Sequence, residues 1–343
     1  MTLNCHQAVH LTREQMSAHS GCLSKLHGCE LEDLLTRAHE LAFGLSTTRP
    51  FYYHPQDCSV IPIDTGPMLA TTDIGPLVGA DLYCAGYIAA MHAMSDIFAR
   101  GGMPRWVLPI LIGNPDHPVE FLEMVMTGIL QACHREGAEV IGGHTSIGPE
   151  AMAGLTVMGL QRSKTLISKT GAQPGDQLLL SKSLGVGMII RAYKLGLTGK
   201  DALEEAVAQM MLSNGPASIS AINAEVHAGT DVSGFGLLGH LTEMLGDTLG
   251  ASLQLTSIPL LNSLACLPPG FGQSCWSKGN MDYANRTLRI VGKTDASHLA
   301  PLLDPQTNGG LLVAVDEGSS AALIASGYTQ IGVVTRTKFI EIL

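Results

Sequence analysis

Four aspartates could take part in metal chemistry, because their neighbours in the sequence are apolar residues or glycines rather than other charges: Asp57, Asp73, Asp96 and Asp231. A carboxylate in such a setting needs a counter-charge. Mg²⁺ uses few protein carboxylates and takes further oxygen ligands from substrate phosphates, so scattered aspartates predict a metal–nucleotide site. The alternative is that each one caps a helix or a turn. Asp96 argues against capping, since it falls late in a predicted helix, where a negative charge is disfavoured unless Arg100 or a cation pairs with it.

The first fifty residues hold cysteines and histidines at a density that could bind a soft metal such as zinc. They include Cys5, His6, His10, His19, Cys22, His27 and Cys29. Their spacing matches no familiar zinc finger and contains no CxxC pair. Cys22 suggests a nucleophile instead, because Gly21 gives it mobility and the ammonium group of Lys25 favours its thiolate. On spacing alone, a zinc site, a nucleophile and an inert thiol all stay open.

Three glycine-rich runs could contact a phosphate. Residues 141–145 and 304–310 form turns whose backbone N–H groups can cradle a phosphate, although such patterns are more often only tight turns. Residues 234–239 match the GxGxxG pattern of dinucleotide-binding proteins. Only residues 230–232 precede that pattern, which is too short for the strand it requires, and no acid for the ribose lies between Asp247 and Asp282. The sequence therefore argues against a nicotinamide site.

Hydrophobic periodicity predicts the elements that would position these residues. Up to residue 160, it predicts strands at 58–63, 67–73, 105–112, 138–144 and 151–160 and helices at 31–45, 82–100 and 118–136. From residue 58 onward this order predicts an α/β layered domain. The polar residues 161–176 are typical of a linker. Beyond them, the pattern predicts helices at 184–195, 201–213 and 216–228 and strands at 177–181, 311–315, 331–334 and 339–343.

Length and composition agree with two domains joined by a linker. A chain of 343 residues is about twice the usual domain size, and 45% hydrophobic against 15% charged residues indicates a compact chain. The formal net charge of −10 argues against a nucleic-acid partner. The longest apolar run, Leu82 to Met91, is too short to cross a membrane, and the N-terminus shows no export signal. We therefore expect a cytoplasmic protein whose 8 cysteines remain thiols.

Seven segments, in order along the chain, resemble those of selenophosphate synthetases. They are Gly21–Lys25, Gln56–Cys58, Ala70–Asp73, Ser95–Gly102, Gly142–His144, Thr230–His240 and Asp304–Gly310. They extend over nearly the whole chain, and the strings SDIFA, DVSGFGLLGH and DPQTNGG are together specific. The resemblance implies the two-domain aminoimidazole-ribotide-synthetase-like fold, α/β followed by α+β. It implies a flexible N-terminal arm over residues 1–50, an α/β domain for ATP binding and dimerisation over 51–162, and an α+β domain over 172–343.

The same resemblance implies an activity and the residues that perform it. The reaction converts ATP, selenide and water into selenophosphate, AMP and phosphate with Mg²⁺. The catalytic residues would be Cys22 and Lys25, and the metal ligands Asp57, Asp96 and Asp231. The nucleotide-binding residues would be Lys25, His54, Pro55, Gln56, Asp73, Asp96, Gly143, His144 and Thr145. The loop at residues 143–145 would reach the ATP bound by the second subunit of a homodimer.

Three positions depart from the pattern of that family. Ser24 stands where a second cysteine is often found, Gln56 where many relatives have an acid, and Asn308 where the glycine-rich loop usually has serine. Two other interpretations remain. A thiamine-phosphate kinase or a purine-pathway ligase of the same fold would not need the arm with Cys22 and Lys25. A non-catalytic metal-binding paralogue would not need to keep these two residues together with all four aspartates.

Overall fold

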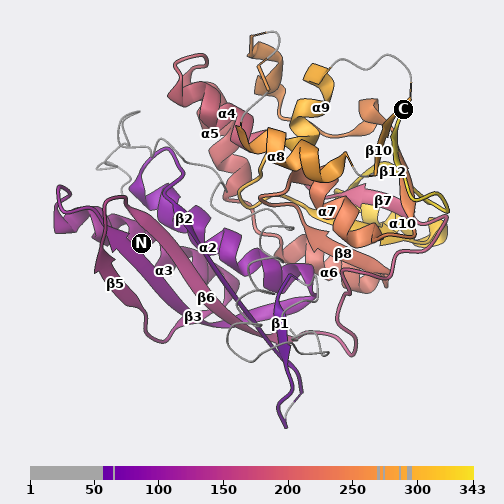
Figure 1. Cartoon of the computed structure of the whole chain (residues 1–343). Coiled ribbons are helices and arrows are strands. Elements are labelled where there is room, and N and C mark those ends of the chain that lie inside the picture. The colour runs from indigo at the N-terminus through magenta and orange to yellow at the C-terminus, as the bar shows by residue number, and fades with distance from the viewer. Residues whose placement is uncertain (1–56, 65, 269–270, 273–274, 286, 292–295) are drawn as a thin grey trace, which may run out of the picture.

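The computed structural model describes residues 57–343, except residues 65, 269–270, 273–274, 286 and 292–295. The predicted helix at 31–45 and the predicted site residues Cys22, Lys25, His54, Pro55 and Gln56 lie outside the described residues. Figure 1 shows the described chain as two halves, each built around its own sheet. This is the α/β followed by α+β architecture that the sequence predicts.

The N-terminal half alternates strands and helices. Its elements are β1 (Ser59–Ile61), β2 (Met68–Pro76), α2 (Leu82–Ala99), β3 (Gly102–Gly113), α3 (Val119–Glu136), β4 (Glu139–Val140), β5 (His144–Ile147) and β6 (Met152–Gln161). The strands form one sheet in the order β1-β2-β6-β3-β4, with β5 also paired to β3. Helix α2 begins where the Asp81 carboxylate accepts a hydrogen bond from the Cys84 N–H (2.7 Å), and α3 ends at Gly137, whose φ is +70°. Both helices agree with the prediction.

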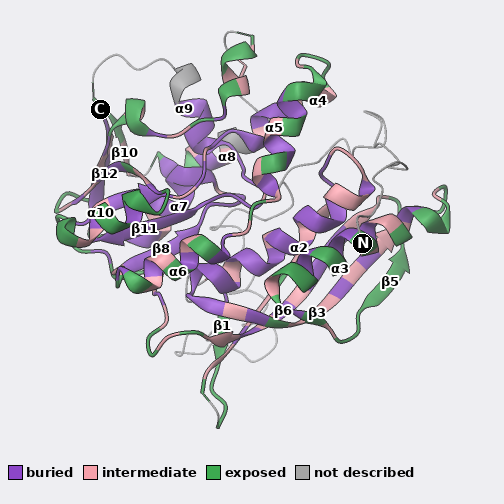
Figure 2. Cartoon of the chain, turned by 180° about the vertical axis from the view of Figure 1, so that it is seen from behind, coloured by how far each residue is buried: buried purple, intermediate pink, exposed green. Residues whose placement is uncertain are grey.

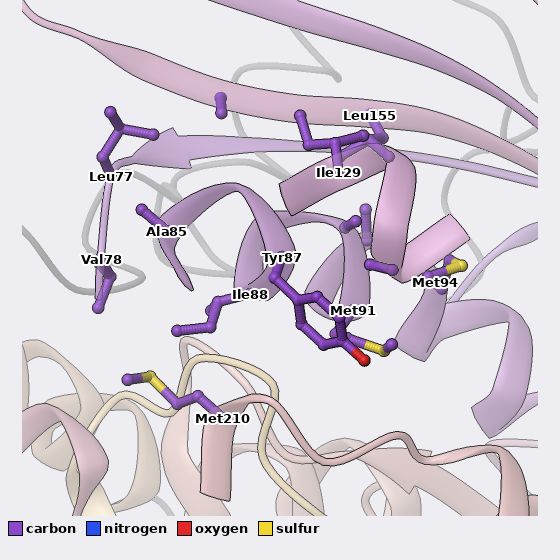
Figure 3. Close-up of a cluster of buried hydrophobic side chains, with 14 of the residues drawn as sticks. Leu77, Val78, Ala85, Tyr87, Ile88, Met91, Met94, Ile129, Leu155 and Met210 are labelled. Atoms are coloured by element: carbon purple, nitrogen blue, oxygen red, sulfur yellow. The ribbon is translucent and has the colours of Figure 1, made fainter. Parts of the chain in front are cut away.

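Helices α2 and α3 cover one face of this sheet. Leu69, Val107 and Leu155, from three neighbouring strands, belong to the same buried cluster as Ile88 of α2 and Ile129 of α3. Figure 3 shows part of this cluster, with the helical side chains packed beneath the strands. All five side chains are almost completely buried. This face of the sheet therefore forms the core of the N-terminal half.

The opposite face of the sheet carries apolar side chains that are only half-buried. Alternate residues of a strand point to opposite faces, so Leu108 and Ile110 point away from the helices that Val107 contacts. Met158 of β6 pairs with Trp106 of β3 and shares this face. All of them except Val107 are half-buried. At the edge of the sheet, Figure 2 shows β5 as exposed.

The C-terminal half is built around a second, mixed sheet. Its elements are β7 (Gln177–Leu180), α4 (Val186–Lys194), α5 (Lys200–Met210), α6 (Gly215–Asn223), β8 (Ala228–Asp231), α7 (Gly236–Leu245), β9 (Gly250–Leu253), α8 (Cys275–Ala284), β10 (Leu288–Ile290), α9 (Ala296–Leu303), β11 (Leu311–Val315), α10 (Glu317–Ala325), β12 (Thr329–Thr335) and β13 (Ile340–Ile342). The strand order is β10-β13-β9-β12-β7-β11-β8. No helix in the described part of the chain is long and apolar enough to span a membrane.

The predicted strand at 138–144 is too long. The chain forms only the short strand β4 there, has no strand over residues 141–143, and begins β5 at His144. Gly143 explains this break, because its φ is +151° and a Cβ at this position would lie 2.6 Å from the Pro109 carbonyl oxygen. His144 and Thr145 therefore lie on an edge strand rather than in a turn.

The chain between α6 and α7 also differs from the prediction. The predicted helix at 216–228 is too long, since α6 ends at Asn223 and Glu225 turns the chain with a φ of +51°. Strand β8 follows, so a strand does precede the glycine run at 234–239. It is an edge strand antiparallel to β11, whereas a dinucleotide-binding unit needs parallel strands joined through the helix. The argument against a nicotinamide site therefore rests on topology, not on a missing strand.

The two halves share a hydrophobic core. Ile88 and Met91 of α2 belong to the same buried cluster as Ile189 of α4 and Met210 of α5. Figure 3 shows Met210 next to Ile88, with its ribbon coming from the C-terminal half. Helix α2 also contacts α6 and β8. It therefore packs on the N-terminal sheet with one side and on the C-terminal half with another.

Residues 162–176 connect the two halves without helix or strand, as the sequence predicts for a linker. Two of their charged side chains are nevertheless buried. Lys169 is 5% exposed and Asp176 is 3% exposed. Since a buried charge needs partners, this segment is part of the packed structure rather than a solvated connection.

Candidate active site

Helix α2 directs three polar side chains toward the boundary between the halves. His92, Ser95 and Asp96 have the i, i+3, i+4 spacing that places side chains on one face of a helix. Polar groups within a buried helix need hydrogen-bond partners. His92 and Asp96 have partners on β2, and Ser95 has a partner on β8. Figure 1 shows that α2 lies close to both strands. Helix α2 thus contributes and positions three of the polar side chains of the site.

Strand β2 directs two polar side chains toward helix α2. Thr71 and Asp73 are two residues apart and point to the same face of the strand. The Thr71 hydroxyl donates to Asp96 Oδ2 (2.6 Å), and Asp73 Oδ2 lies 3.0 Å from His92 Nε2. Since His92 Nδ1 accepts a hydrogen bond from the Asn308 backbone N–H (3.1 Å), the histidine proton is on Nε2 and is donated to Asp73.

Strand β8 ends at Asp231, whose carboxylate is 2% exposed and faces α2. Ser95 Oγ donates to Asp231 Oδ2 over 2.8 Å. The Asn214 side-chain amide in turn donates to Ser95 Oγ over 2.9 Å. The contact between Ser95 and Asp231 joins residues that are 136 positions apart in the sequence, one from each half of the molecule.

A buried lysine from the segment between the halves holds Asp57. Lys169 Nζ and Thr230 Oγ1 each donate to Asp57 Oδ1 over 2.8 Å. Asp57 Oδ2 is also buried and has no hydrogen-bond partner among the described residues. Burial raises the pKa of Asp57, and the Lys169 charge works against that rise. One oxygen of this carboxylate is therefore satisfied and the other lacks a donor.

The same lysine pairs with Glu243 of α7, with 2.8 Å between Lys169 Nζ and Glu243 Oε2. Burial disfavours the ammonium ion, but Asp57 and Glu243 outweigh that effect and hold the pKa of Lys169 above its ordinary value. Burial also disfavours the ionised Glu243, but Lys169 and His240 outweigh it and lower the pKa of Glu243 to about 2. Both carboxylates therefore pair with the same ammonium ion.

The thiol of Cys58 indicates that three aspartates surround a common region. Burial is the main cause of a pKa raised well above the usual value for this cysteine. The negative charges of Asp96, Asp57 and Asp231 raise the Cys58 pKa further, while Arg100 opposes them. A charge acts strongly on a group only at short range, so the three carboxylates share one neighbourhood. Cys58 itself is an un-ionised packing residue.

The glycine-rich loop at 304–310 closes the N-terminus of α4. Asp304 Oδ2 accepts a hydrogen bond from the Met188 N–H (3.0 Å), and Gln306 Oε1 accepts one from the Gly185 N–H (3.1 Å). Burial raises the pKa of Asp304 to about 7 against the effect of these donors. The side chains of this loop therefore satisfy free backbone groups of a helix.

Asn308 connects this loop to the end of α5. It has a φ of +48°, and its side-chain amide donates to the carbonyl oxygens of Met210 (2.5 Å) and Leu212 (2.9 Å). Lys182 Nζ donates to the carbonyl oxygens of Leu212 (2.8 Å) and Asn308 (2.9 Å). Burial lowers the pKa of Lys182 to about 7, with Asp231 opposing the change. The asparagine at this position thus bonds two carbonyl groups that a serine could not reach together.

The structure brings together the four aspartates that the sequence singles out. Asp57, Asp96 and Asp231 lie around Cys58, and Asp73 joins the same face of α2 through His92. None of the four is the N-cap residue of a helix for which the structure describes the cap.

Gly143, His144 and Thr145 lie apart from these aspartates within one chain. Figures 1 and 2 both show β5 at the far side of the N-terminal sheet from β8. His144 and Thr145 are exposed on that edge strand.

Sequence reasoning assigned no role to three polar residues of this site. Lys169 stands in a polar run and looked like part of a solvated linker. Asn214 falls between the predicted helices at 201–213 and 216–228. His92 offered a usable signal, because it is one of few polar side chains in a buried helix and lies one turn before Ser95 and Asp96.

The carboxylates of this site could bind a metal ion. Among the described residues, no three His, Cys, Asp or Glu side chains cluster closely enough to hold a metal ion by themselves. Carboxylate oxygens are nevertheless the ligands that Mg²⁺ prefers, and this ion leaves several positions for water and phosphate. The buried, unpartnered Asp57 Oδ2 is an oxygen that such an ion would neutralise. The residues therefore fit Mg²⁺ that is shared with a phosphate.

Two protein-family models match the chain. The model described as AIR synthase related protein, N-terminal domain, matches residues 55–161, and the corresponding C-terminal domain model matches residues 173–342. The segment between the two matches contains Lys169.

Curated relatives that carry the name selenide, water dikinase match most of the chain. The relative from Porphyromonas gingivalis is 33% identical over 312 residues, which are 90% of this chain and 88% of the relative. The relative from Aeromonas salmonicida is 35% identical over 300 residues, which are 84% of this chain and 86% of the relative.

Solved structures with other names share the fold. Thiamine monophosphate kinase from Aquifex aeolicus superposes with a TM-score of 0.64 at 18% identity, covering 91% of this chain and 96% of the other. The hydrogenase maturation protein HypE in complex with ATP superposes with a TM-score of 0.63 at 18% identity, covering 93% and 92%. At this level of identity, the similarity shows the fold alone.

Proposed function

The chain belongs to the selenide, water dikinase family, and from this premise we propose that it makes selenophosphate from selenide, ATP and water, with AMP and phosphate as the other products. The relatives that carry this name align over both halves. The kinase and the maturation protein that share the fold are only 18% identical, so neither favours a second function.

One observation carries the proposal: the sequence runs that are typical of the family meet at the domain boundary. Ser95 of the SDIFA run donates to Asp231 of the DVSGFGLLGH run, and Asn308 of the DPQTNGG run donates to His92 on α2. ATP brings several negative charges, while the chain has 20 Lys and Arg residues against 30 Asp and Glu. Metal ions between carboxylates and phosphates suit such a chain better than a basic pocket would.

The aspartates would hold the metal. We assign Mg²⁺ to Asp57, Asp96 and Asp231, and the nucleotide site to Asp73 with Asp96. Bound there, Mg²⁺ would neutralise charge on the transferring phosphates. Each proposed metal ligand already accepts a hydrogen bond from a hydroxyl group, provided by Thr230, Thr71 and Ser95 respectively. These donors would fix the carboxylates before the metal arrives.

The nucleophile is assigned by resemblance to Cys22, with Lys25 as its partner. Cys22→Ser should abolish or severely reduce selenide-dependent turnover, because a hydroxyl is hardly ionised near pH 7. Lys25→Ala should fail as well, while Cys29→Ser, the matched control, should be nearly neutral. A zinc site would instead make Cys22→Ser and Cys29→Ser equally harmful and would leave stoichiometric zinc in the purified protein. His54, Pro55 and Gln56 are proposed to contact the nucleotide.

A homodimer is supported by two features of the N-terminal half. The half-buried apolar face with Trp106, Leu108, Ile110 and Met158 would be covered by a second copy. His144 and Thr145 lie on β5, three strands from Asp73 of β2 in the same sheet, so residues 143–145 would complete the site of the other subunit. Sedimentation at micromolar concentration should show a dimer. A fully active monomer would contradict this arrangement.

We also propose where the protein is found in the cell and where its domains begin and end. We place the protein in the reducing cytoplasm, where thiols persist, and among the described residues Cys58, Cys133 and Cys266 are free thiols. We take residues 51–162 and 172–343 as the two domains and residues 1–50 as the arm that carries Cys22.

Phosphorus NMR tests the proposed reaction. Purified protein with Mg²⁺, ATP and selenide should produce a selenophosphate signal and AMP, and ATP breakdown should stop when selenide is left out. Accumulation of ADP together with a phosphorylated organic acceptor would contradict the proposal and favour a kinase of the same fold.

A further inference from the structure

Asn214 lies directly before α6, at the boundary between the two halves, and is 1% exposed. Its amide nitrogen donates to Ser95 Oγ over 2.9 Å and to the Gly309 backbone oxygen over 2.8 Å. One side chain therefore connects α2 of the N-terminal half with the glycine-rich loop of the C-terminal half. No charge is involved in either contact.

The direction of each hydrogen bond in this chain follows from chemistry. The Gly309 carbonyl oxygen can only accept, so the amide nitrogen of Asn214 must face it. That nitrogen has a second hydrogen, which goes to Ser95 Oγ. A hydroxyl that accepts from an amide is free to donate its own hydrogen elsewhere, and the carboxylate of Asp231 lies 2.8 Å away. The Ser95 hydrogen therefore points at Asp231 Oδ2.

We propose that Asn214 is a positioning residue that acts through Ser95 to orient Asp231 for the metal. The inference rests on the proposed function, because it takes Asp231 as a ligand of Mg²⁺. Without the amide, the Ser95 hydroxyl is no longer held in one orientation, and Asp231 loses a fixed donor. Since Asn214 also binds Gly309, Asp231 is held in this way only when the loop at 304–310 is docked against α2.

The test measures metal binding directly, with Mn²⁺ as the probe and a non-hydrolysable ATP analogue present. Free Mn²⁺ is quantified by electron paramagnetic resonance in the full chain and in Asn214→Ala, Ser95→Ala and the double variant. Groups that orient metal ligands typically change metal affinity by about 10–100-fold when removed. We expect each single variant to bind Mn²⁺ about tenfold more weakly. The double variant should be no weaker than Ser95→Ala, because Asn214 acts through the hydroxyl.

Ser218→Ala is the matched control. Ser218 is also 1% exposed, lies on α6 and donates across the same boundary, but to the Phe98 carbonyl oxygen (2.6 Å) rather than to a carboxylate chain. It should bind Mn²⁺ within about twofold of the unmodified chain. If Asn214→Ala does not fold by circular dichroism, Asn214→Leu fills a similar volume, removes both N–H donors without adding a charge and should show the same loss.

Two results would overturn the inference. In the first, Asn214→Ala and Ser218→Ala bind Mn²⁺ equally well, which makes Asn214 a packing residue. In the second, the losses of the two single variants multiply in the double variant, which means that Asn214 does not act through Ser95. If the unmodified chain binds no Mn²⁺ with the analogue, the proposed metal site fails, and this inference fails with it.

Discussion

Asp57 and Asp231 lie in the same site but are held in opposite ways. Asp57 accepts from a buried ammonium ion, Lys169, which it shares with Glu243. Asp231 accepts from a neutral hydroxyl, Ser95, which an amide orients. The first arrangement balances charge in a buried place, and the second fixes a direction without supplying charge.

The two arrangements have different consequences: the ion cluster affects the stability of the fold, and the neutral hydrogen bonds affect the orientation of a carboxylate. A buried ion cluster is marginal when complete but very costly when one member is removed, because the remaining charges are left without a partner. A neutral hydrogen bond to a carboxylate contributes less when lost, but it determines where the oxygens point. We therefore expect changes around Asp57 to unfold the protein and changes around Asp231 to leave it folded with a weaker metal site.

Lys169→Met should have the largest effect, because it leaves Asp57 and Glu243 buried without a cation. The expected loss is about 3–5 kcal/mol in the free energy of unfolding, measured by urea denaturation. Lys164→Met is the control, since Lys164 lies in the same segment but is exposed. Equal stability of the two variants would show that the ion cluster contributes nothing.

Glu243→Gln should show the pH dependence of the same cluster. The pKa of Glu243 is lowered to about 2 in the folded protein, so its ionised form stabilises the fold above pH 4.5, and this contribution is lost as the pH falls toward 2. The variant should lose about 3 kcal/mol at pH 7, and the loss should shrink below about pH 4.5. Glu204→Gln, at an exposed ion pair on α5, should change stability little at any pH. A deficit that stays constant down to pH 3 would contradict the assignment.

Thr71→Val should have a smaller effect, since it removes a neutral donor to Asp96 and keeps the shape of the side chain. We expect a loss of about 1.5 kcal/mol that does not vary between about pH 5 and 8. Thr72→Val changes the neighbouring residue, whose exposed hydroxyl pairs with that of Thr156 (2.9 Å), and should cost less. If Thr71→Val were as harmful as Lys169→Met, the distinction between the two kinds of contact would fail.

The sequence was sufficient to predict the elements with strong periodicity and the unusual carboxylates. Helices α2 and α3 were predicted because their caps and apolar positions are local features. Asp57, Asp96 and Asp231 were conspicuous because each stands among apolar residues or glycines. Strand β9 and helices α8, α9 and α10 were not predicted, since their patterns are short or interrupted, as by Pro301 inside α9.

The partners of the aspartates could not be predicted. Lys169 lies 112 residues from Asp57, and Thr230 lies 173 residues from it. Nothing in the local sequence of Lys169 distinguishes a buried cation from a solvated one, because its burial arises only when the two halves dock. The same holds for Asn214, whose contacts with Ser95 and Gly309 exist only in the folded domain boundary.

Titration calorimetry of Mg-ATP into Asp231→Asn tests the central claim most directly. Asparagine retains an oxygen that can accept from Ser95 but removes the charge that a metal ion needs. The account predicts that Mg-ATP affinity falls by at least about tenfold while the urea midpoint stays close to that of the unmodified chain. Unchanged Mg-ATP affinity together with a collapse of stability would show that Asp231 is structural and that the metal site lies elsewhere.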